Sequence, residues 1–133
     1  MAEEQKRRVL LLDDEKFLLE IYKLSFEKNG YEVYLYNDVE SALNALRSGL
    51  GPDVILFDIT MPDGRSGYEF IETVKREGLS KKSLKVALTN EGQDAEQARM
   101  KELGADAHML KAHYIPSELA QAVGKMLDER AHK

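Results

Sequence analysis

Apolar and polar residues alternate along the chain with two periodicities, one typical of strands and one typical of helices. Five short runs rich in Val, Ile, Leu and Tyr predict strands. In two of them the stretches Leu10–Leu12 and Val54–Phe57 are apolar without alternation, as expected for strands covered on both faces of a parallel sheet. The runs are Arg8–Leu12, Tyr31–Tyr36, Val54–Phe57, Leu84–Leu88 and Ala107–Leu110.

Helical patterns lie between and after these runs. Apolar residues recur every three or four positions in five segments, which are Phe17–Phe26, Ala42–Leu46, Tyr68–Val74, Ala95–Leu103 and Leu119–Leu127. Asp38 is placed to cap the second helix, and Asn29-Gly30, Gly78 and Gly104 are placed to end three of them. Ser117 and Glu118 open the last helix. The strict alternation predicts an α/β fold with a parallel sheet and helices on both faces.

Length and composition narrow the class of protein. The 133 residues fit one domain of ordinary size. The formal charge of −5 argues against nonspecific nucleic-acid binding, which needs a basic surface. The chain has no cysteine, which excludes disulfides and thiol chemistry. No apolar run approaches the roughly 18 residues of a membrane helix, and no signal peptide is recognisable, so we expect a cytoplasmic protein.

Chemically active side chains follow four of the five predicted strands. They are Asp13 and Asp14, Asp58, Thr89 and Lys111. Each has a plain structural explanation, because acids cap helices, hydroxyls complete turns and lysines lie at surfaces. Parallel α/β sheets, however, bind ligands at the carboxyl ends of their strands, and all five residues fall on that edge. Their convergence favours a site.

The chemistry of such a site follows from its residue types. Converging carboxylates repel one another and need a cation, and oxygen-only ligands suit Mg²⁺ or Mn²⁺. A lysine and a hydroxyl opposite the metal can contact the other oxygens of a phosphoryl group. A carboxylate can itself accept phosphate as an acyl phosphate. The set therefore favours phosphoryl transfer, which depends mainly on positioning and charge neutralisation.

The ordered motifs LLLDDE, FDITMPDG, ALTN and LGADAHMLKAH resemble those of the receiver domain of bacterial two-component response regulators. The resemblance covers nearly the whole chain. It implies a single flavodoxin-like (βα)5 domain over residues 1–133, with a core from about residue 7 to 130 and strand order 2-1-3-4-5. It also implies a phosphorylation-controlled signalling switch.

The resemblance assigns roles at the metal end of the site. Asp58 is the expected phosphoacceptor. Asp13 and Asp14 are expected to hold Mg²⁺, with Mn²⁺ as a substitute, and Asp14 is the expected direct ligand. Asp58 and the backbone carbonyl of Thr60 complete this metal site.

The resemblance also assigns the residues that respond to phosphate. Thr89 is the expected switch hydroxyl, and Lys111 is the expected phosphate-contacting lysine. His108, three residues before Lys111, falls at the family's rotating aromatic position.

Partners follow from the same resemblance. A sensor histidine kinase or phosphotransfer protein should supply the phosphoryl group, and a downstream effector protein should read the altered surface. We expect no direct DNA binding by this chain and no membrane contact. The chain is expected to catalyse its own phosphorylation and slow dephosphorylation without being a turnover enzyme, and either to act alone or to form part of a longer regulator.

Three positions depart from the family pattern. The stretch Asp63–Gly67 contains one extra residue in the loop after Asp58. Asn90 replaces a very small residue and should slow the loss of phosphate. Ala112 replaces the proline that normally follows the lysine through a cis bond, and we expect the Lys111–Ala112 bond to keep the cis geometry despite its cost of about 2.5–4 kcal/mol.

Other functions remain alternatives. A receiver-like protein-interaction module that is never phosphorylated is the nearest one. A haloacid dehalogenase-type phosphatase needs an acid where Thr60 stands, and a flavodoxin needs a phosphate-binding loop where the chain has Asp13-Asp14-Glu15. A metal site at His108 and His113 lacks further ligands in the sequence.

Overall fold

The computed structural model describes residues 6–61, 66–90 and 94–131. Its strands are β1 (Arg7–Leu12), β2 (Tyr31–Tyr36), β3 (Val54–Asp58), β4 (Leu84–Thr89) and β5 (Ala107–Leu110). Its helices are α1 (Lys16–Lys28), α2 (Val39–Arg47), α3 (Gly67–Glu77), α4 (Asp94–Leu103) and α5 (Pro116–Ala131), with a short 3₁₀ turn at Lys111–His113.

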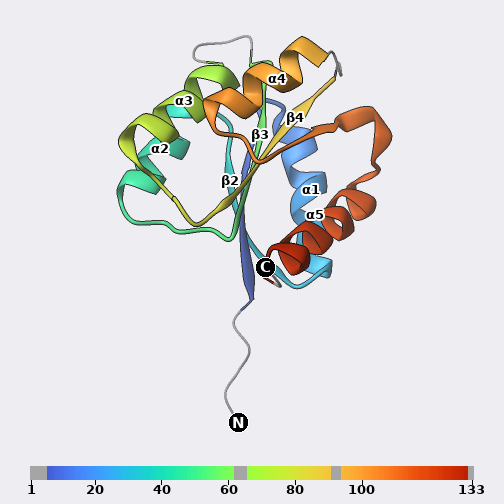
Figure 1. The fold of residues 1–133 in the computed structure, drawn as a ribbon. Coiled ribbons are helices and arrows are strands. Elements are labelled where there is room, and N and C mark those ends of the chain that lie inside the picture. Colours follow the sequence, from blue (N-terminus) through green and yellow to red (C-terminus); the bar gives the residue numbers. More distant parts are fainter. Residues whose placement is uncertain (1–5, 62–65, 91–93, 132–133) are drawn as a thin grey trace.

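The five strands form one parallel sheet in the order β2-β1-β3-β4-β5, which confirms the predicted flavodoxin-like fold (Figure 1). The strand order reverses between β1 and β3, which lie side by side with Leu12 opposite Phe57. Such a reversal opens a crevice at the carboxyl ends of the two strands. Asp13 and Asp58 flank that crevice.

Helices cover both faces of the sheet (Figure 1). Val9 and Leu11 of β1 point into a core shared with α1 and α5, whereas Leu10 and Leu12 point into a core shared with α2, α3 and α4. Alternate residues of one strand enter opposite cores because successive side chains of a strand point to opposite faces. This double burial holds β1 and β3 rigidly beneath the crevice.

Most predicted element ends agree with the structure. The Asp38 side chain accepts a hydrogen bond from the Ser41 amide at 2.8 Å and caps α2. Gly78 ends α3 in the left-handed conformation, with φ of 67°. β3 and β4 each extend one residue further than predicted, so that Asp58 and Thr89 belong to the strands themselves. The last helix begins at Pro116, one residue early, where proline's fixed φ suits a first helical position.

The expected cis bond between Lys111 and Ala112 is wrong, because the described residues contain no cis peptide bond. The chain reverses through the 3₁₀ turn instead, and the Tyr114 amide donates to the Lys111 carbonyl at 3.3 Å. A trans turn avoids the penalty of about 2.5–4 kcal/mol that a non-proline cis bond carries. Beyond this turn Tyr114 packs against the core, whereas Ile115 is 61% exposed.

Within the stretch Asp63–Gly67, where the sequence predicts one extra residue, Asp63, Gly64 and Arg65 lie outside the described residues. Among the helices that the structure describes, none has the length and apolar character needed to cross a bilayer.

Candidate functional site

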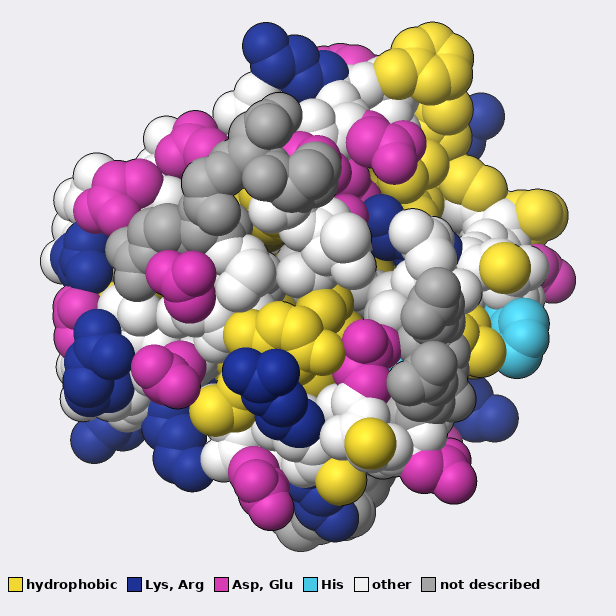
Figure 2. All heavy atoms as spheres, turned by 90° about the horizontal axis from the view of Figure 1, so that it is seen from above, with side chains coloured by type: hydrophobic (Ala, Val, Ile, Leu, Met, Phe, Trp, Pro, Cys, Tyr) yellow, Lys and Arg dark blue, Asp and Glu magenta, His cyan; other side chains and the backbone are white. Residues whose placement is uncertain are grey.

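Three carboxylates meet at the carboxyl ends of β1 and β3. One oxygen from each of Asp13, Asp14 and Asp58 lies within 4.8 Å of the others. Asp13 and Asp58 are buried and Asp14 is half-buried. Figure 2 looks onto this end of the molecule, where acidic side chains gather among hydrophobic ones. The structure thus brings together the three acids that the sequence placed at this edge.

Lys111, which directly follows the edge strand β5, contacts these acids. Its Nζ donates to Asp13 Oδ2 at 2.8 Å and to Asp58 Oδ2 at 3.0 Å. Burial works to lower the pKa of Lys111, but the contacts with Asp13 and Asp58 outweigh it and raise the pKa overall. The lysine therefore stays charged and partly neutralises the two buried carboxylates.

Asp58 is an acid whose surroundings disfavour its charge. Burial raises its pKa from the usual 3.8 to about 6, Lys111 works in the opposite direction, and Asp13 adds to the rise. Its Oδ1 accepts a hydrogen bond from the Thr60 amide at 3.0 Å, which fixes the carboxylate plane. A carboxylate of this kind is poorly solvated and is stabilised by a cation beside it, and acids with pKa values raised in this way often occur at functional sites.

The raised pKa of Asp58 makes stability depend on pH. Between pH 4 and 6 the folded protein binds more protons at this residue than the unfolded chain does, so stability falls as pH rises through that window. We expect Asp58→Asn to raise the unfolding free energy of the metal-free protein by about 2–3 kcal/mol at pH 7 and to change it little at pH 4. Urea denaturation in chelator measures both, with the exposed Glu20→Gln as the control variant. An equal gain at the two pH values would contradict the burial argument.

Gly67 lies directly against the phosphoacceptor candidate's backbone. A Cβ added at this position would stand 2.3 Å from the Asp58 carbonyl oxygen and 2.7 Å from Ile59 Cα. The Gly67 amide donates to the Ile59 carbonyl at 3.1 Å, and the Ser66 side chain caps α3 at the Glu69 amide. The start of α3 is thereby packed onto the end of β3, and only glycine fits.

Thr89 ends β4, the strand beside β3, and its side chain is buried. Its Oγ1 donates to Glu96 Oε1 of α4 at 2.8 Å. His108 of β5 approaches the same Glu96 oxygen through Nε2 at 3.4 Å. The structure therefore connects the predicted switch hydroxyl and the predicted rotating ring through a carboxylate.

A pocket of about 300 Å³ opens beside Lys111 and is lined by Asn90, Tyr22 and Tyr114 among others. Burial raises the pKa of Tyr22, the charge of Lys111 works to lower it, and the charges of Asp13 and Asp58 add to the rise. Asn90 is exposed at the mouth of this pocket. The residue that replaces the small side chain of the family thus borders the approach to Lys111.

Sequence reasoning missed three residues at the site, which are Tyr22, Gly67 as a packing requirement, and Glu96. From the sequence alone, Tyr22 is recognisable only as a core position on an amphipathic helix. Glu96 is one of several acids on α4, and its spacing from Thr89 follows no recognisable motif. The role of the Thr60 carbonyl as a metal ligand and the roles of the other site residues remain proposals.

Comparisons with known proteins agree with this geometry. The pattern of the family described as response regulator receiver domain matches residues 9–124. The phosphate regulon transcriptional regulatory protein PhoB of Escherichia coli is 35% identical over 117 residues, which cover 88% of this chain and 50% of PhoB. PhoB of Klebsiella pneumoniae matches to the same extent. The chain thus spans about half the length of these curated relatives.

Solved structures give the same result. The chemotaxis response regulator CheY4 of Vibrio cholerae is 26% identical with a TM-score of 0.81, and the match covers 91% of this chain and 98% of that one. A CheY-like receiver domain protein from Methanospirillum hungatei is 26% identical with a TM-score of 0.84, covering 96% and 98%. With the acids, the lysine and the sheet order in place, this chain belongs to the family of response regulator receiver domains.

Proposed function

We propose that the chain is a phosphoacceptor that takes a phosphoryl group onto Asp58 in a Mg²⁺-dependent reaction. The observation that carries this proposal is the bridging position of Lys111 Nζ between Asp13 and Asp58 at 2.8 and 3.0 Å. The donor is a sensor histidine kinase or a phosphotransfer protein, as membership of a two-component family implies. The receiver domain covers residues 1–133, with its core at about 7–130.

The acid cluster fits the metal that the family implies. Its donors are carboxylate oxygens, which are the hard ligands that Mg²⁺ prefers, and Mn²⁺ accepts the same set. Asp13, Asp14 and Asp58 would hold the ion together with the Thr60 carbonyl. When bound, Mg²⁺ neutralises the charge that accumulates when a phosphoryl group approaches buried carboxylates.

The protein's own groups carry out the transfer. An oxygen of Asp58 forms a bond to phosphorus while the bond from phosphorus to the donor breaks, and the electron pair of that bond leaves with the donor. The Lys111 ammonium contacts a phosphoryl oxygen, and the Thr89 hydroxyl contacts another. Lys111 already lies at 3.0 Å from Asp58, so positioning costs little reorganisation.

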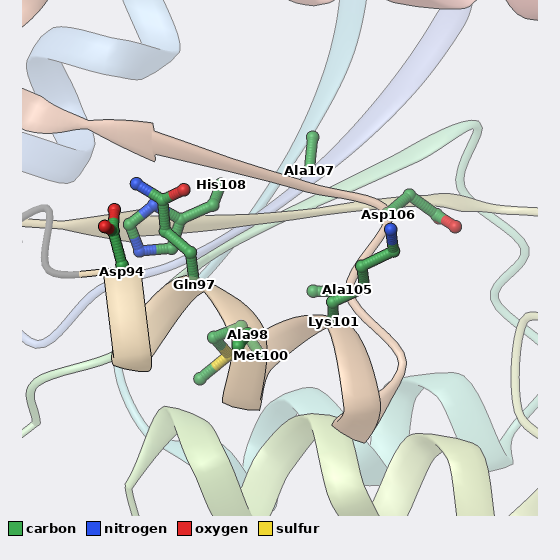
Figure 3. A pocket seen from close by; sticks show the side chains of 9 residues that line it. All are labelled: Asp94, Gln97, Ala98, Met100, Lys101, Ala105, Asp106, Ala107 and His108. Atoms are coloured by element: carbon green, nitrogen blue, oxygen red, sulfur yellow. The ribbon is translucent and has the colours of Figure 1, made fainter.

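The phosphorylated protein acts through a face built from α4, β5 and α5. Thr89 and His108 both contact Glu96 of α4, so a movement of Thr89 toward phosphate changes the contacts at the start of this helix. A pocket of about 370 Å³ lies between α4 and β5, and His108 lines it together with Asp94 and Gln97 (Figure 3). A downstream effector protein reads this face.

Beryllofluoride, which mimics a phosphoryl group on a carboxylate, tests the proposal. We expect it to saturate one site per chain only with Mg²⁺ present and to raise the thermal midpoint of the wild-type protein. Asp58→Asn should abolish both effects, and the exposed Glu20→Gln should preserve them. Saturation of the Asp58→Asn variant would contradict the assignment, and absence of any binding would favour the unphosphorylated interaction module.

A further inference from the structure

Glu96 connects three elements around the end of β4. Its Oε1 accepts from the Thr89 hydroxyl at 2.8 Å, and its Oε2 accepts from the Tyr68 hydroxyl of α3 at 3.2 Å. The side chain is only 22% exposed. The Arg99 guanidinium lies 4.0 Å from the centre of the Tyr68 ring and covers it. Hydrogen bonds to both carboxylate oxygens therefore hold the Glu96 side chain in place.

The same carboxylate borders the His108 ring. His108 Nε2 lies 3.4 Å from Glu96 Oε1, and the His108 side chain is 9% exposed. This nitrogen is buried and makes no hydrogen bond of good geometry within the described residues. In Figure 3 the ring lies beside Asp94 and Gln97 of α4, at one end of the pocket between α4 and β5. The His108 ring thus lies against the same carboxylate oxygen that accepts from the Thr89 hydroxyl.

A threonine hydroxyl has one proton to donate. A hydroxyl that donates it to Glu96 cannot donate the same proton to a phosphoryl oxygen on Asp58. Hydrogen bonds to a charged acceptor are stronger than those between neutral groups. Glu96 is thus a built-in competitor for the hydroxyl that the phosphorylated site requires.

We infer that Glu96 is a positioning residue that retains the Thr89 hydroxyl, and with it the His108 ring, in the arrangement of the unphosphorylated protein. Phosphorylation must break the bond from Thr89 to Glu96 before the switch completes. Removal of Glu96 then favours the phosphorylated arrangement. This inference rests on the proposed function, because it takes Asp58 as the phosphoacceptor and Thr89 as the responding hydroxyl.

The test compares half-saturating beryllofluoride concentrations at a fixed Mg²⁺ concentration. Glu96→Ala should lower that concentration roughly tenfold, as expected for loss of one hydrogen bond to a charged acceptor. Glu96→Gln keeps an acceptor oxygen without the charge and should give a smaller gain. Glu102→Ala removes an exposed acid from the same helix and should change nothing. Unchanged or weaker binding in Glu96→Ala overturns the inference.

A Thr89→Ala background distinguishes an effect of Glu96 through the Thr89 hydroxyl from an effect of its negative charge alone. If Glu96 acts through the hydroxyl, Glu96→Ala gives no gain in a chain that already carries Thr89→Ala. A gain of equal size in that background assigns the effect to the lost negative charge and overturns the inference. A merely structural role for Glu96 predicts lower stability and no tighter binding.

A second measurement does not depend on the proposed function. In the unphosphorylated protein, the His108 ring resonances in NMR spectra should move in Glu96→Gln and in Thr89→Ala, and should stay in place in Glu102→Ala. Unmoved resonances in the first two variants overturn the coupling itself. Failure of the wild-type protein to bind beryllofluoride, with the resonance shifts present, instead contradicts the phosphoacceptor proposal.

Discussion

Lys111→Met should lower the free energy of unfolding of the metal-free protein by about 3–5 kcal/mol at pH 7, the usual cost of removing one partner from a buried ion pair. The Lys111 side chain is 10% exposed, and its ammonium contacts Asp13 at 2.8 Å and Asp58 at 3.0 Å. Methionine preserves much of the apolar stem but leaves two buried carboxylates facing each other. Urea denaturation in chelator measures the loss.

The loss of unfolding free energy in Lys111→Met should be smaller at lower pH and smaller in the presence of Mg²⁺. Asp58, with a pKa of about 6, becomes protonated as pH falls, so the difference from wild type should shrink at pH 5. Mg²⁺ should stabilise the variant more than the wild-type protein, because the ion replaces the missing positive charge. Lys125→Met removes an exposed lysine and serves as the control. Equal losses for the two variants would show that the buried contacts contribute nothing.

Gly67→Ala should destabilise the protein by about 3 kcal/mol or more, at or above the upper end of typical overpacking costs. The added Cβ would meet the Asp58 carbonyl oxygen at 2.3 Å and Ile59 Cα at 2.7 Å, and neither backbone atom can rotate away. Either β3 or the start of α3 must move. Because Asp58 is the residue displaced, beryllofluoride binding should weaken as well.

Gly124→Ala is the matched control for that substitution. Its Cβ would come no closer than 3.4 Å to the Tyr31 hydroxyl, which is ordinary contact. Alanine inside α5 should stabilise the protein by up to about 1 kcal/mol through helix propensity. Thermal unfolding of both variants gives the comparison. Similar midpoints for Gly67→Ala and Gly124→Ala would contradict the packing argument.

The sequence predicted the architecture well because burial on both faces leaves a clear pattern. Apolar runs such as Val54–Phe57 located the strands, and the position of Asp58 after one run placed it at the functional edge. The cis expectation at Lys111–Ala112 failed because it transferred a proline's geometry to an alanine, for which the penalty is several times larger. The role of Glu96 was not predicted because the sequence pattern of a helix does not reveal which distant hydroxyl an acid on its surface contacts in the fold.

Direct detection of an acyl phosphate on Asp58 tests the central claim. The wild-type protein is incubated with a small acyl phosphate and Mg²⁺, reduced with borohydride, which converts an aspartyl phosphate to homoserine, and mapped by peptide mass spectrometry. We predict one modified residue per chain, at Asp58, which is absent in chelator and absent in Asp58→Asn. Modification at another residue, or undiminished stoichiometric labelling of Asp58→Asn, would contradict it.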